Sequence, residues 1–172
     1  LGGEALSRLA AEQWLEGDAH LTHIVRFSLL MGPAAGVVVA DTLLGESNAC
    51  QAVPIGQSLA TVGEHAIAAQ LAGVLRRKDV KCFDAFRLEV SAAYRSGQRQ
   101  TAVDAFYEAR GRFPDDARLF ELELTALRAT GQWRAAKYAL DQRLKEGRAT
   151  PGDLVALMDV LTQPSLLKEA KI

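Results

Sequence analysis

The sequence lacks an excess of charge of either sign. Its 20 lysines and arginines face 21 aspartates and glutamates, so the formal net charge is −1 and the pI is about 6.4. Proteins that bind nucleic acid or anionic lipid need a surplus of positive charge on the binding face. The composition therefore argues against nucleic acid and membrane surfaces as partners.

A long apolar run is also missing. One uncharged, largely apolar stretch covers residues 27–40 and is interrupted by Gly32-Pro33. A helix that crosses a bilayer needs about 20 consecutive apolar residues. We therefore expect no membrane insertion, and we interpret this stretch as two helices that meet at a buried corner.

Cysteine is scarce, with Cys50 and Cys82 as its two occurrences. They form no C-x-x-C pair, and no histidine lies at ligand spacing from either, so we predict no metal site and no cofactor. We expect free thiols in a cytoplasmic protein, because a disulfide would need the two Cα atoms within about 7 Å in an oxidising compartment. A periplasmic location stays open if the N-terminus before Leu1 is processed.

Catalytic motifs are absent as well. The sequence contains no G-x-S-x-G, H-E-x-x-H, G-x-x-x-x-G-K or G-x-G-x-x-G. His20 and His23 lie three residues apart, with Glu16 four residues before His20, but a third committed ligand is missing. We interpret them as surface or groove histidines and predict that the chain is not an enzyme.

What the sequence does contain is helix-forming composition with an internal repeat. Alanine and leucine dominate and aromatic residues make up 6%, which predicts an all-α fold. Gly63, Gly97 and Gly131 follow one another at intervals of 34 residues. Alignment on these glycines also superposes an alanine five residues later, which is Ala68, Ala102 or Ala136. Four residues after that alanine the aligned residues are Ala72, Phe106 and Leu140.

This spacing has a simple physical explanation. A length of 34 residues accommodates two helices of about 14 residues and two short connections. A glycine just past a helix can adopt the left-handed conformation that ends it. Small residues let the two antiparallel helices of each hairpin cross closely, while a larger residue fills the space beside the crossing. Hairpins that are apolar on two faces must then stack on their neighbours.

The chain resembles the tetratricopeptide repeat family, whose period is 34 residues. The middle repeat carries the family pattern in full, with Asp115-Asp116 as the expected cap of the next helix: Gly97, Ala102, Phe106, Ala109 and Pro114. The flanking repeats are degenerate, with Ala72 in place of a large residue, Arg143 in place of a small one, and a proline displaced to Pro151. Glu89 falls where the family usually has leucine.

The resemblance implies a right-handed α-solenoid of antiparallel helix-turn-helix repeats. We expect about three repeats over residues 49–147. Residues 1–48 would form a degenerate repeat or extra helices, over residues 4–16, 20–31 and 34–44. Residues 148–172 would contain a capping helix that begins at Thr150-Pro151-Gly152-Asp153 and ends at Pro164. One face of this helix would be apolar: Leu154, Leu157, Met158 and Leu161.

Members of this family bind extended peptides in a concave groove that is lined by the first helix of each repeat. The resemblance thus implies a set of groove candidates, of which Arg87, Tyr94 and Arg128 are the preferred contacts: Gln57, Arg87, Ser91, Tyr94, Glu121, Thr125 and Arg128. These residues do not reproduce the Lys and Asn clamp of the chaperone-binding members. Arg76-Arg77-Lys78 is interpreted as a solvated helix end. Trp14 and Trp133 are candidate interface anchors, with core packing expected for Trp133.

We therefore predict a protein-binding scaffold or adaptor. Fourteen arginines against six lysines suggest a bacterial, GC-rich source. The alternatives are a secretion-system chaperone or apparatus component, or the interaction domain of a larger enzyme or regulator. Self-assembly into a homo-oligomer is a further alternative, because the end of a repeat array exposes apolar surface.

Overall fold

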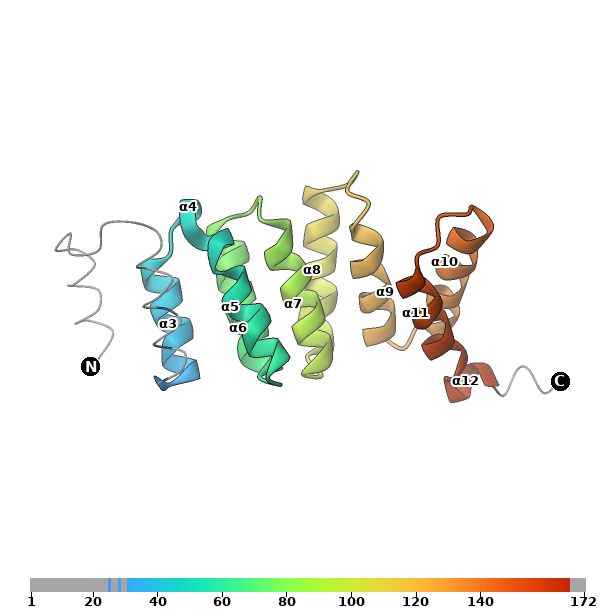
Figure 1. Cartoon of the computed structure of the whole chain (residues 1–172), viewed down its shortest axis with the longest axis horizontal. Helices are drawn as coiled ribbons and strands as arrows, with labels where there is room; N and C mark the ends of the chain where they lie inside the picture. The colour runs from blue at the N-terminus through green and yellow to red at the C-terminus, as the bar shows by residue number, and fades with distance from the viewer. Residues whose placement is uncertain (1–24, 26–27, 29–30, 168–172) are drawn as a thin grey trace.

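The computed structural model describes residues 25, 28 and 31–167, and throughout these residues the regular elements are helices, without strands (Figure 1). The prediction of an all-α fold is confirmed. In chain order the elements are α3 (Pro33–Leu43), α4 (Glu46–Ala49), the 3-10 helix η1 (Cys50–Ala52), α5 (Val53–Thr61), α6 (His65–Lys78), α7 (Phe83–Arg95), α8 (Arg99–Arg112), α9 (Leu119–Ala129), α10 (Trp133–Lys145), α11 (Pro151–Leu161) and α12 (Pro164–Leu167). The helix expected over residues 4–16, most of that over 20–31, and Trp14, His20 and His23 lie outside the described residues.

The helices lie side by side in a row from α3 to α11 (Figure 1). From α5 to α11 each helix packs against the next one along the chain. Short connections between packed helices make neighbours antiparallel. In addition α7 packs against both α5 and α9, so the first helices of successive hairpins are neighbours in space.

The three repeat glycines all adopt the left-handed conformation, as expected. Their φ angles are +92° for Gly63, +79° for Gly97 and +71° for Gly131. Gly147 also has a positive φ, +66°, and follows the end of α10. A side chain with a Cβ atom rarely adopts this conformation, which explains why glycine recurs at these places.

The turn at Gly97 shows how each hairpin is closed. The N–H of Gln98 donates to the carbonyl of Ala93 at 2.8 Å, and the N–H of Gly97 donates to the carbonyl of Tyr94 at 3.1 Å. This is the Schellman pattern, which satisfies carbonyls that the end of a helix leaves unpaired. The same pair of bonds recurs around Gly63 and Gly131.

Small residues form the contacts between the helices. Ala68, Ala102 and Ala136, which follow the three glycines at equal spacing, are all completely buried. One buried cluster consists entirely of alanines from α6, α7, α8 and α9: Ala68, Ala69, Ala92, Ala93, Ala102 and Ala129. Alanine at a crossing lets two helix backbones approach closely.

Larger residues fill the space beside the alanines. Phe86 and Phe106 are buried in one cluster with Ala105, Ala109 and other apolar residues. Phe113 packs on this cluster, with its ring centroid 5.7 Å from that of Phe86 in an edge-to-face arrangement. Leu140 lies in a separate cluster with Ala136, against which Trp133 is partly buried.

Helix α9 begins differently from the prediction. Its N-cap residue is Arg118, and neither aspartate before it occupies that position. Asp116 instead accepts a hydrogen bond from the N–H of Arg118 at 2.9 Å, which forms an Asx turn ahead of the helix. Asp115 is exposed.

Helix α11 begins as predicted but buries a different face. Thr150 and Asp153 form a capping box with Pro151 in the first turn. The buried side is that of Val160, with Leu157 partly buried against the same cluster. Leu154, Met158 and Leu161 are exposed, Met158 to 69%, so of the four residues on the predicted apolar face Leu157 is the one that packs inward. Residues three or four apart share a face of a helix. Leu154, Met158 and Leu161 are six, two and one residues from Val160, so they lie on a different side of the helix.

Gly97→Ala should lower the free energy of unfolding by about 1–2 kcal/mol, because alanine is strained at positive φ. Nothing lies within 4 Å of a Cβ atom built at this position, so the effect would come from the backbone alone. Gly111→Ala is the control: it is an open position inside α8, where alanine should stabilise by about 0.5–1 kcal/mol. Urea unfolding of both variants checks this, and a neutral Gly97→Ala would contradict it.

Candidate functional site

Helices α5, α7 and α9 carry the residues predicted to line a groove. On α7, Asp84, Arg87, Ser91 and Tyr94 are all at least partly exposed. Their spacing of three and four residues places them along one face of the helix. On α9 the corresponding polar residues are Glu121, Thr125 and Arg128, and on α5 Gln57 is exposed.

The polar residues of α7 and α9 meet at two points. The guanidinium of Arg128 lies over the ring of Tyr94, 5.4 Å from its centroid. Arg118, just before α9, approaches Asp84 to 3.9 Å. The structure thus brings Tyr94 and Arg128 together, while Arg87 pairs with Asp84 on its own helix at 3.3 Å.

Hydroxyl groups on these helices are already bonded to their own backbone. Ser91 donates to the carbonyl of Leu88 at 3.1 Å, and Thr125 donates to the carbonyl of Glu121 at 3.0 Å. These two hydroxyls would have to break a bond in order to donate to a ligand. Within residues 31–167 the side-chain amide of Gln57 has no hydrogen bond, which leaves it available.

Arg128 has a structural role that the sequence did not reveal. It forms an ion pair with Asp159 of α11, and its side chain is 25% exposed, compared with 43% for Arg87. Its Nε is buried and has no hydrogen-bond partner in the described part of the chain. Arg128 therefore links α9 to α11, and Arg87 is the better exposed of the two arginines.

Next to Arg128 is a cavity of 360 Å³ between α9, α10 and the start of α11. Glu121, Arg128 and Arg143 line it. Arg143 departs from the family pattern, and its surroundings explain why it is tolerated. Its guanidinium stacks on Phe120, 4.1 Å from the ring centroid, and lies 3.4 Å from the carboxylate of Asp153.

The basic run Arg76-Arg77-Lys78 is only in part the solvated helix end that we expected. Arg77 is exposed and Lys78 lies 3.7 Å from Asp41 of α3, but Arg76 is largely buried, with its side chain 17% exposed. Arg76 donates from Nε to Glu89 of α7 at 2.5 Å. It also binds Glu108 of α8, so one guanidinium joins three helices.

Glu89 is the one charged residue fully buried among the described residues, at 4% exposure. Gly73 leaves space for it, because a Cβ at that position would lie 3.1 Å from Glu89 Oε1. Burial raises the pKa of the Glu89 carboxyl, and this outweighs the lowering by the Arg76 guanidinium beside it. The carboxylates in turn raise the pKa of Arg76 against the opposing effect of its burial.

Arg76→Met should cost about 3 kcal/mol of stability, because it leaves the Glu89 carboxylate buried without a partner. The pKa of Glu89 in the folded state would rise further. The contribution of Glu89 to stability would then be fully present below its pKa in the unfolded chain, about 4.3. That contribution would be lost as the pH rises through the pKa of Glu89 in the folded state. Denaturant unfolding between pH 4 and 8 measures this.

The double variant Arg76→Met/Glu89→Leu should recover most of the stability and lose the added pH dependence, because apolar pairs can replace buried ion pairs. Arg112→Met is the control: Arg112 forms an exposed i,i+4 pair with Glu108, worth about 0.5 kcal/mol or less. Equal losses for Arg76→Met and Arg112→Met would contradict the role of the buried network.

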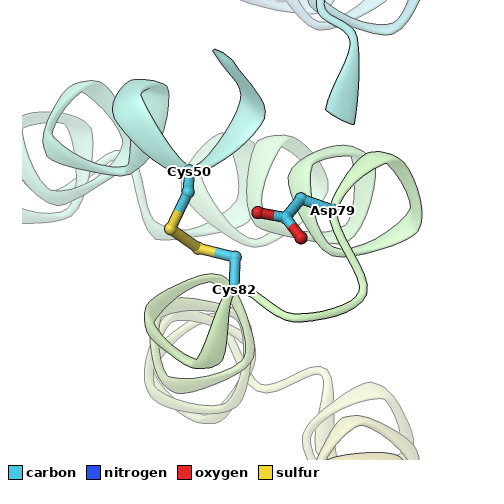
Figure 2. A group of neighbouring side chains, drawn as sticks. All are labelled: Cys50, Asp79 and Cys82. Carbon is cyan, nitrogen blue, oxygen red and sulfur yellow. A yellow bond between two sulfur atoms is a disulfide. The ribbon is translucent and has the colours of Figure 1, made fainter. Parts of the chain in front are cut away.

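The two cysteines form a disulfide, so the prediction of free thiols is wrong (Figure 2). Cys50 lies in η1 and Cys82 immediately precedes α7, and their Cα atoms are 5.6 Å apart. Packing of α4 against α6, and of α5 against α6 and α7, brings these distant residues together. The bond joins the chain before α5 to the start of α7.

Asp79 lies beside this disulfide. One ligand atom from each of Cys50, Asp79 and Cys82 lies within 4.8 Å of the others. The carboxylate of Asp79 is turned toward the side where the two sulfur atoms lie (Figure 2). Spacing in the sequence could not reveal this group, because the hairpin of α5 and α6 separates Cys50 from the other two residues.

Reduction of the disulfide should lower the free energy of unfolding by about 3–4 kcal/mol, the value expected for a closed loop of this length. Urea unfolding with and without a phosphine reductant measures the difference. The Cys50→Ser/Cys82→Ser variant serves as the control, since its unfolding should not respond to the reductant. An unchanged midpoint for the natural chain would contradict a stabilising role for the bond.

Comparison with protein-family models, curated proteins and solved structures finds no match to this chain. Among the described residues, no helix is both long enough and apolar enough to cross a membrane.

Proposed function

We propose that this chain is a scaffold or adaptor that binds an extended segment of another protein along α5, α7 and α9. The observation that carries the proposal is that α7 packs against both α5 and α9 and that each of the three helices exposes polar groups. Gln57, Arg87 and Tyr94 offer an amide, a guanidinium and a phenol, which combine contact area with directional hydrogen bonds.

The proposal includes the arrangement of the repeats. We infer a right-handed α-solenoid similar to tetratricopeptide repeats, with the binding face on its concave side. The 34-residue spacing, the shared Schellman turns and the contacts of α7 with α5 and α9 support this inference. Residues 148–172 would form the cap of the array. A terminal cap normally presents a polar outer face, and α11 departs from this because it leaves Met158 and Leu154 exposed.

Several of the alternatives share this mode of binding. A secretion-system chaperone or apparatus component, or the interaction domain of a larger enzyme or regulator, would use the same face. The expectation of a cytoplasmic location depended on free thiols, and the disulfide removes that support because such bonds persist in oxidising compartments.

The binding face can be tested by site-specific crosslinking. A photo-reactive amino acid placed at Gln57 should crosslink to the partner in lysate of the source organism, whereas the same group at Tyr138, exposed on α10, should not. Mass spectrometry then identifies the crosslinked segment, which is synthesised and titrated by calorimetry. Crosslinks from Gln57 to a second copy of the chain would support self-assembly instead.

Arg87→Glu should weaken binding of that segment about tenfold or more, which corresponds to about 1.4 kcal/mol. Arg110→Glu is the matched control, because Arg110 is exposed on α8, the second helix of its hairpin. Arg128 is unsuitable for this test, since its reversal would also break the ion pair with Asp159. Equal affinities for Arg87→Glu and the natural chain would overturn the binding face.

A further inference from the structure

The Asp79 carboxylate closes a turn with one oxygen, and it lies beside a disulfide that offers it no partner. A disulfide is neutral and has no proton to donate to a carboxylate. Among the described residues, no cationic side chain pairs with Asp79, whose carboxylate accepts a hydrogen bond from the backbone N–H of Lys81 at 2.9 Å. That bond occupies Oδ1, and the other carboxylate oxygen remains available.

The position of Asp79 relative to Cys82 does not depend on the disulfide. The N–H of Asp79 donates to the carbonyl of Leu75 at 2.9 Å, which ends α6. The N–H of Cys82 donates to the carbonyl of Asp79 at 3.2 Å. These bonds close a tight turn that holds the carboxylate and the Cys82 sulfur near each other, so two donors would remain in place after reduction.

Reduction would turn this group into a set of metal ligands. A dithiol reductant supplies two electrons and two protons, its own thiols becoming a disulfide, and leaves thiols at Cys50 and Cys82. A divalent cation that binds both sulfurs then releases two protons to solvent. Two thiolates and a carboxylate suit a thiophilic cation such as Zn²⁺, which accepts sulfur and carboxylate oxygen in tetrahedral geometry.

We propose that the reduced chain binds one Zn²⁺ through Cys50, Cys82 and Asp79. Cys82 is buried at 3% exposure, whereas Cys50 and Asp79 are at least partly exposed, so water can complete the coordination. The cation would join η1 to the start of α7, which is the connection that the disulfide makes under oxidising conditions. This site is separate from the proposed binding face and does not depend on it.

The proposal can be tested with Co²⁺, a spectroscopic substitute for Zn²⁺, added to the full chain after reduction by a phosphine. We expect one equivalent to bind, with a near-ultraviolet charge-transfer band from thiolate to cobalt and visible bands typical of tetrahedral coordination. Zn²⁺ should displace the Co²⁺ and abolish the bands. The oxidised chain should show no such band, because a disulfide has no thiolate to offer.

Variants distinguish the three ligands from accidental binding elsewhere. Asp79→Asn should weaken Co²⁺ binding by at least about tenfold, whereas Asp115→Asn, at an exposed aspartate, should leave the affinity unchanged. Cys50→Ser should reduce the thiolate band by half or more, with circular dichroism confirming that the variant is folded. Absence of a thiolate band in the reduced natural chain would overturn the site, and equal affinity for Asp79→Asn would remove Asp79 from it.

Discussion

Close crossing of helices through alanine is the contact on which the rest of this structure depends. Ala68, Ala102 and Ala136 are completely buried at equivalent positions of three hairpins. Alanine brings little apolar area, so its contribution is the short distance that it permits between backbones. That distance depends on the turn before each of these helices, where a left-handed glycine ends the preceding helix and sets the direction of the next.

The buried charges add a different kind of constraint. Three helices that pack through small apolar residues could slide past one another at little cost, but Arg76 must reach both Glu89 and Glu108. Desolvation makes such a network a weak source of net stability, and any displacement that leaves Glu89 unpaired is expensive. We infer that the network contributes mainly to the register of α6, α7 and α8.

The region before α5 is held both by hydrophobic packing and by a covalent bond. Ala40, Leu44 and Ala49 lie in one buried cluster with residues of α6. Leu71, Leu75 and Cys82 belong to that cluster, and the disulfide bonds Cys82 to Cys50 of η1 beside it. The same two sulfurs lie beside the carboxylate of Asp79. A single place in the fold therefore combines an apolar core, a covalent link and a group of donors suited to a cation.

The sequence by itself determined the all-α class, the turn positions at Gly63, Gly97 and Gly131, and the capping box at Thr150. These are local properties, because φ preferences and helix caps depend on residues within one turn of each other. Tertiary structure alone decided that Cys50 meets Cys82, that Arg76 is buried, and which face of α11 packs inward. Each of those outcomes depends on how separate helices pack against one another. The spacing of residues along the chain does not give the distance between residues on different helices.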